Sequence, residues 1–166
     1  MIRIFALFCF SLLLASCGLQ PLYSGGSTGA VATTLGSVSV EPIQGKSGWL
    51  MRNALNDRLG ASGNDAPRYR LVVALDDDIE GFGVRANDTI TRERRTLRAR
   101  YQLIDNATGT TVVDATAGSD AGIDVVSSEY ATIAGENSAL ENLSQRVADQ
   151  IVTRLSLYAR QTQTAE

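Results

Sequence analysis

The most unusual chemistry in this chain is a row of four arginines at alternating positions near its middle. We call this row the arginine comb; it consists of Arg92, Arg94, Arg98 and Arg100. Side chains along a β-strand alternate between two faces, so the four guanidinium groups are predicted to share one face, and the alternating apolar residues from Leu97 to Leu103 to point the other way. Guanidinium groups bind phosphate and carboxylate groups bidentately. The alternative is a solvated strand face, balanced by acids such as Asp76 and Asp78 on a neighbouring strand.

A second reactive group is the thiol of Cys17. It follows a basic start at Arg3 and an apolar run over residues 4–14. That run is shorter than the ~20 residues of a membrane-spanning helix and has the size of a signal-peptide core. Residues 14–18, Leu-Ala-Ser-Cys-Gly, resemble the lipobox of bacterial lipoproteins, in which small residues before the cut let the backbone enter a peptidase. We therefore expect residues 1–16 to be a lipoprotein signal peptide.

The predicted modification of Cys17 would anchor the mature protein in a membrane. Its thiol would accept a diacylglycerol and its new amino group an acyl chain such as palmitate, and each buried methylene contributes ~0.8 kcal/mol. Gly18 stands where inner-membrane retention signals usually have Asp, which favours the outer membrane, with the protein on its periplasmic side. The alternative is an ordinary cleaved signal beside an incidental cysteine.

Composition excludes several classes of site. The chain has 166 residues, a net charge of -3 and no histidine, so it lacks both a global attraction to nucleic acid and the commonest general base. Its two cysteines, Cys9 and Cys17, both lie in the N-terminal segment, which leaves the body without a disulfide or a catalytic thiol. Residues 76–81 resemble a calcium loop only faintly, and a charged turn at a strand end is the better interpretation. We predict no enzymatic activity, no metal and no cofactor.

The comb must be positioned by a small mixed domain. We expect strands at Val38–Val40, Tyr69–Leu75, Leu97–Leu103 and Thr110–Ala117, and helices at Gly48–Leu59, capped by Ser47, and at Glu136–Tyr158. This β-α-β-β-β-α order predicts an α+β two-layer sandwich with two helices packed on one face of a four-stranded, mostly antiparallel sheet. Residues 17–35 are glycine-rich and predicted to be a lipidated flexible tether, residues 36–160 a single domain, and residues 161–166 a C-terminal tail.

The start of the predicted mature chain resembles a known family. Residues 17–23, Cys-Gly-Leu-Gln-Pro-Leu-Tyr, are similar to the Cys-Gly-Phe-x-Pro-Leu-Tyr start of the lipopolysaccharide-assembly lipoproteins called LptE. The match continues more loosely through Tyr130-Ala131 and Ala139 to residues 154–158, which resemble an Arg-Leu-x-x-Tyr helix end. The chain departs from the pattern in Leu19, which replaces an aromatic residue, and in its long tether.

The resemblance implies a non-enzymatic role. Members of the family plug the outer-membrane β-barrel LptD, assist its assembly and help insert lipopolysaccharide into the outer leaflet. In that setting the arginine comb would bind phosphates or acidic sugars of lipopolysaccharide. Two alternatives stay open: an auxiliary lipoprotein of a lipid-transporting ABC system, which would not need a basic strand face, and an anchored hydrolase, which the missing histidine disfavours.

Overall fold

The computed structural model describes residues 29–60, 67–84 and 90–164. Cys17, the predicted signal peptide and most of the predicted tether lie outside the described residues. The elements follow in the order α2 (Ala30–Gly36), β1 (Val38–Val40), α3 (Gly45–Leu59), β2 (Tyr69–Val84), β3 (Ile90–Asp105), β4 (Thr111–Asp124) and α4 (Glu129–Thr164).

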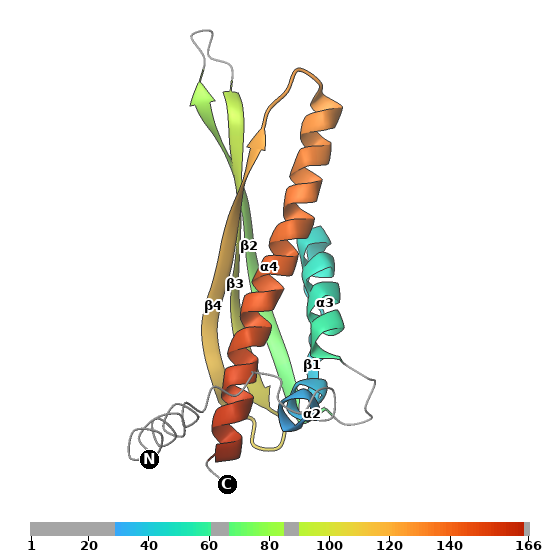
Figure 1. The fold of residues 1–166 in the computed structure, drawn as a ribbon, viewed down its shortest axis with the longest axis vertical. Coiled ribbons are helices and arrows are strands. Elements are labelled where there is room, and N and C mark those ends of the chain that lie inside the picture. The colour runs from blue at the N-terminus through green and yellow to red at the C-terminus, as the bar shows by residue number, and fades with distance from the viewer. Residues whose placement is uncertain (1–28, 61–66, 85–89, 165–166) are drawn as a thin grey trace, which may run out of the picture.

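The strands form one sheet in the order β1-β2-β3-β4. The short β1 runs parallel to β2, whereas β2, β3 and β4 pair antiparallel in sequence order. All three described helices lie on one side of this sheet, and α4 runs along nearly its whole length (Figure 1). The predicted α+β fold with a mostly antiparallel four-stranded sheet is therefore confirmed, with β3 in the middle of the long strands.

The core lies between the sheet and the helices. The predicted inward phase of β3 is confirmed, because Leu97, Ala99, Tyr101 and Leu103 are all buried. They meet the apolar stripe of α4, in which Leu143, Val147, Ile151 and Leu155 are also buried, as its 3–4-residue spacing predicted. None of the helices in the described ranges lies on the opposite face of the sheet, and the side chains of β3 on that face are exposed (Figure 1).

The strand β1 has its predicted bounds, whereas β2, β3 and β4 are about twice as long as their sequence patterns indicated. The predicted turn at Asp76–Gly81 is wrong, because these residues continue β2 and pair in register with β3. Aspartate is a poor strand former, but here the acids of β2 face the arginine-rich stretch of β3. Pairing between oppositely charged strands thus overrides the local preference for a turn.

The helices also differ from the prediction in extent. The last residues of the predicted tether, 30–35, form the helix α2 together with Gly36, and Val31 and Leu35 of this helix join the core. The helix α3 begins at Gly45 with Gln44 as its N-cap, three residues before the predicted start. The long helix α4 begins at Glu129 and extends to Thr164, so it includes much of the predicted C-terminal tail.

The early start of α4 has a local cause. The backbone of Ala131 donates a hydrogen bond to the Ser128 hydroxyl, and Glu129 places a negative charge in the first turn. Both arrangements stabilise a helix N-terminus. None of the helices in the described ranges combines the length and the hydrophobicity that a membrane span requires.

Candidate functional site: the arginine comb on the open sheet face

The structure brings the whole arginine comb together on the open face of β3. Arg92, Arg94, Arg98 and Arg100 are all exposed, as the alternation predicted. The residues on either side of the comb belong to β2 and β4, because β3 pairs with both strands. The comb is therefore the central row of a three-strand surface.

Three of the four arginines hold a carboxylate from β4. Arg92 Nε lies 3.0 Å from Asp124 Oδ1, Arg100 Nη2 lies 3.2 Å from Asp114 Oδ2, and Arg94 Nε lies 3.9 Å from Asp120 Oδ2. The expectation that acids balance the comb is thus confirmed, but the partners come from β4, not from Asp76 and Asp78 of β2. Asp76 and Asp78 do lie on the neighbouring strand β2, with Asp76 directly opposite Arg98, but neither forms an ion pair with the comb among the described residues.

Strand register explains which arginines are paired. Arg92 stands directly opposite Asp124, while Arg94 and Arg100 stand opposite Gly122 and Thr116 and reach diagonally. Arg98 stands opposite Gly118, which has no side chain. Within the described part of the chain, Arg98 makes no ion pair or hydrogen bond.

The face as a whole is a mixed-charge surface. The four arginines of the comb lie between two strands that carry six acids on the same face of the sheet. These acids are Asp76, Asp78, Glu80, Asp114, Asp120 and Asp124. An isolated basic patch would repel other cations and attract any polyanion. This face instead offers alternating charges, so its selectivity must come from the positions of individual groups.

Asp114 is the most strongly engaged of these acids. It accepts hydrogen bonds from Gln102 Nε2 at 2.9 Å and from Arg100 Nη2 at 3.2 Å. Hydrogen bonds from Gln102 and then Arg100 lower the pKa of Asp114 below its ordinary value, because they stabilise the charged carboxylate. The Arg100–Asp114 pair therefore persists to more acidic pH than an isolated aspartate would allow.

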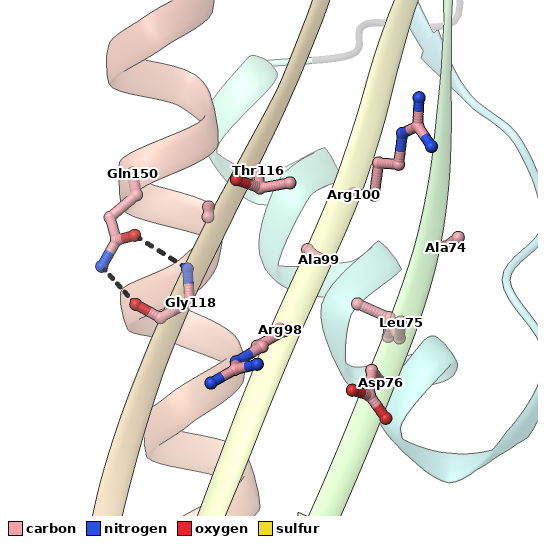
Figure 2. Close-up of a pocket in the computed structure, with 10 residues that line it drawn as sticks. Ala74, Leu75, Asp76, Arg98, Ala99, Arg100, Thr116, Gly118 and Gln150 are labelled. Carbon is pink, nitrogen blue, oxygen red and sulfur yellow. Dashed lines mark hydrogen bonds between the residues drawn. The ribbon is translucent and has the colours of Figure 1, made fainter.

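A hollow of about 640 Å³ opens on this face around Arg98. It is lined by Ala74 and Asp76 from β2, by both Arg98 and Arg100 from β3, and by Thr116 and Gly118 from β4. Figure 2 shows Arg98 leaning toward Gly118, while Asp76 projects from β2 in a different direction. This volume is in the range of small-ligand sites.

The Gly118 rim of the hollow is fixed from behind by α4. The Gln150 side chain donates Nε2 to the Gly118 carbonyl and accepts the Gly118 N–H at Oε1, both at 3.2 Å (Figure 2). A primary amide matches the donor–acceptor pattern of a peptide group. Sequence analysis missed Gln150, since nothing local indicates which helix residue will reach the strand edge.

One arginine of the same stretch faces the helices and was also missed. Arg95 binds both carboxylate oxygens of Asp77 at 2.8 Å and donates Nη1 to the Glu136 carbonyl of α4 at 3.0 Å. Its side chain is only 12% exposed, and its hydrogen bonds with Asp77 raise its pKa above the ordinary value. Its odd-numbered position in the strand, out of phase with the comb, was the available signal.

No group of three or more acidic, histidine or cysteine side chains in the described ranges is placed to hold a metal ion. What the comb can do chemically is bind anions through guanidinium groups, with carboxylates available to accept hydrogen bonds from hydroxyl groups.

Comparison with solved structures shows that the fold recurs. A candidate lipoprotein from Caulobacter crescentus superposes with a TM-score of 0.69 at 22% identity, covering 81% of this chain and 98% of that one. A minor lipoprotein from Acinetobacter baumannii gives 0.57 at 18% identity, covering 72% and 90%. Rare lipoprotein B from Shewanella oneidensis gives 0.55 at 11% identity, covering 78% and 97%. A search of curated proteins finds no match.

The family assignment comes from the sequence profile. Residues 35–155, which include every strand of the sheet and most of α4, match the family described as LptE, lipopolysaccharide-assembly. This range covers well over half of the chain, and the resemblance seen in residues 17–23 lies outside it. On this match, and with the fold described above, the chain belongs to the LptE family of lipopolysaccharide-assembly proteins.

Proposed function

We propose that this protein is held on the periplasmic side of the outer membrane by a lipid on Cys17, plugs the LptD β-barrel and assists its assembly. In that position it would help insert lipopolysaccharide into the outer leaflet. Family membership supports the assembly role. The barrel, the anchor and direct lipopolysaccharide binding are the further steps of the proposal.

The observation that carries the plug proposal is the open, charged face of the sheet. A surface with ten alternating charges does not suit lipid or an apolar partner, whereas the interior of a large membrane barrel is polar. The body is also long enough. Sixteen-residue strands span about 50 Å, which exceeds the ~30 Å hydrocarbon core of a bilayer.

The partner can be identified from the native membrane. We expect the detergent-solubilised protein to co-purify with a large outer-membrane barrel in equal amounts, and a photo-crosslinker at Thr116 or Asp78 to join the two chains. Recovery with an inner-membrane transporter instead would support the auxiliary lipoprotein of a lipid-transporting ABC system. Recovery without any stoichiometric partner would contradict the plug proposal.

We further propose that the arginine comb binds anionic groups of lipopolysaccharide. Replacing all four arginines by glutamine is expected to weaken lipopolysaccharide binding by about tenfold or more, since each charge-assisted contact is worth roughly 1.5–3 kcal/mol. Binding by the wild type should weaken as salt rises, because exposed charges are screened over about 10 Å. Binding and thermal midpoint would be measured together on the purified protein.

The control removes three positive charges from the helical layer. Its substitutions are Arg52→Gln, Arg146→Gln and Arg154→Gln, all at exposed positions. Lys46 and Arg58 are unsuitable, because they bind Asn137 and Asp149 and so join α3 to α4. If both variants lose binding equally, the effect is one of net charge, and if only the comb variant unfolds, the comb is a structural partner of β4.

A further inference from the structure

Arg98 and Arg100 both line the hollow, but Arg100 is paired with Asp114, whereas Arg98 has no ion pair among the described residues. In the part of the chain that the structure describes, the other three arginines each have an aspartate within 4 Å. The diagonal neighbour of Arg98 on β4 is Asp120, but that carboxylate lies at 3.9 Å from Arg94. Arg98 therefore keeps its hydrogen-bond donors available for a ligand.

The hollow exists because its rim residue is a glycine. A Cβ atom at Gly118 would lie 3.3 Å from both Arg98 Cγ and the Leu97 carbonyl oxygen, so a side chain there would crowd Arg98 and fill the space. Gly122, which stands four residues farther along the same face of β4, has nothing within 4 Å of such a Cβ. A substitution at Gly118 and the same substitution at Gly122 therefore form a test and its matched control.

Other polar groups around the hollow suit a sugar. Thr116 contributes a hydroxyl and Asp76 a carboxylate, and both are exposed on the same sheet face as Arg98. Asp76 stands directly opposite Arg98 in the register but forms no ion pair with it among the described residues. A carboxylate next to an anion-binding arginine would accept hydrogen bonds from hydroxyl groups and would disfavour a densely charged polyanion.

We propose that this hollow binds one anionic group carried on a sugar, with Arg98 as the anion-binding residue and Asp76 and Thr116 facing the sugar hydroxyls. The proposal rests on the proposed function, since phosphorylated sugars form the head group of lipopolysaccharide. Only one arginine of the comb then binds the anion, because Arg92, Arg94 and Arg100 are paired with aspartates of β4. Gln150 positions the rim through the Gly118 peptide.

The test uses the full-length protein in detergent, with glucosamine 1-phosphate as the probe and glucosamine, which lacks the phosphate, as the control. We expect the phosphate sugar to bind and Arg98→Gln to weaken it by about tenfold or more, as loss of a charge-assisted bond implies. Arg92→Gln should change the affinity by less than about twofold, because Arg92 is already engaged by Asp124. Equal losses in the two variants would overturn the assignment.

A second pair of variants tests the hollow itself. Gly118→Val is expected to abolish probe binding, whereas Gly122→Val should leave it unchanged, and thermal midpoints would identify any variant that fails to fold. If Gly118→Val folds and binds like the wild type, the hollow is not the site. In that case a loss of probe binding in Arg98→Gln would not support the hollow as the site, and the proposal would be overturned.

The outcomes separate this inference from the function on which it rests. If the wild type binds lipopolysaccharide and the barrel while Arg98→Gln binds the lipopolysaccharide equally well, only the hollow assignment fails. If the wild type binds glucosamine 1-phosphate through Arg98 but binds neither lipopolysaccharide nor a barrel, the hollow is a site for another sugar phosphate. The proposed function then fails, although the assignment of the hollow holds.

Discussion

Replacing Cys17 by alanine is expected to abolish lipidation and to leave the N-terminal segment uncleaved. In the proposed lipobox the acceptor is the thiol of Cys17, and residues 14–18 contain no other thiol that could take the diacylglycerol. Without acyl chains the protein would lose the proposed anchor, to which each buried methylene would contribute ~0.8 kcal/mol. Mass spectrometry of the N-terminal peptide measures the change directly, with a lipid-modified Cys17 expected in the wild type.

The matched control is Cys9→Ala. Cys9 lies inside the apolar run, so its replacement should leave both cleavage and acylation of Cys17 intact. A wild-type protein that starts at another residue and carries no lipid would contradict the anchor, and with it the proposed attachment to the outer membrane.

The second large effect is expected from Arg95→Met. Removal of this guanidinium leaves Asp77, whose side chain is 18% exposed, without its bidentate partner, and the Glu136 carbonyl without its donor. Breaking a largely buried ion pair from one side is strongly destabilising, so we expect a loss of about 2–3 kcal/mol in the free energy of unfolding. Urea denaturation monitored by circular dichroism provides the measurement.

Two further variants show whether the pair itself is responsible. Arg94→Met, on the exposed face of the same strand, should change the stability by less than about 1 kcal/mol. The double variant Arg95→Met/Asp77→Leu should recover much of the loss, because no unpaired charge remains. If Arg95→Met alone is as stable as the wild type, the contacts of Arg95 with Asp77 and Glu136 do not hold α4 against the sheet.

The sequence predicted the arrangement of the comb because side-chain alternation is a local property. Leu97 and Ala99 define the inward phase of β3, and the arginines between them must then face outward. The same reasoning could not assign their partners. β3 has a neighbour on each side, and the register of both decides which acids come within reach. Asp76 was therefore expected to balance the comb, whereas the ion pairs are made by aspartates of β4.

The ends of elements were missed for a different physical reason. Hydrophobic periodicity marks only the part of an element that contacts the core. Beyond Leu75, β2 continues with charged residues that pair with β3, and before Glu136, α4 continues above the region that α3 covers (Figure 1). The helix α2 was hidden in a glycine-rich segment, where Val31 and Leu35 were the only apolar signal.

The hollow could not have been anticipated from Gly118 alone. A glycine within a strand indicates weak packing or the close approach of another group, without saying which. Its meaning appears only when the register places it opposite Arg98 and when Gln150 is seen to hold its peptide. Long-range pairing thus converts an unremarkable residue into part of a candidate binding site.

The pairing of Gln150 with Gly118 has a consequence for how molecules of this protein behave toward one another. The outer strand β4 is a border of the sheet, 14 residues long, with neither lysine nor proline to discourage a neighbouring chain from adding a strand. The Gln150 amide occupies a donor and an acceptor near the centre of that border, so an incoming strand would have to displace it to run past. We therefore expect this single side chain of α4 to hinder the edge-to-edge pairing of sheets that builds fibres, in addition to shaping the rim of the hollow.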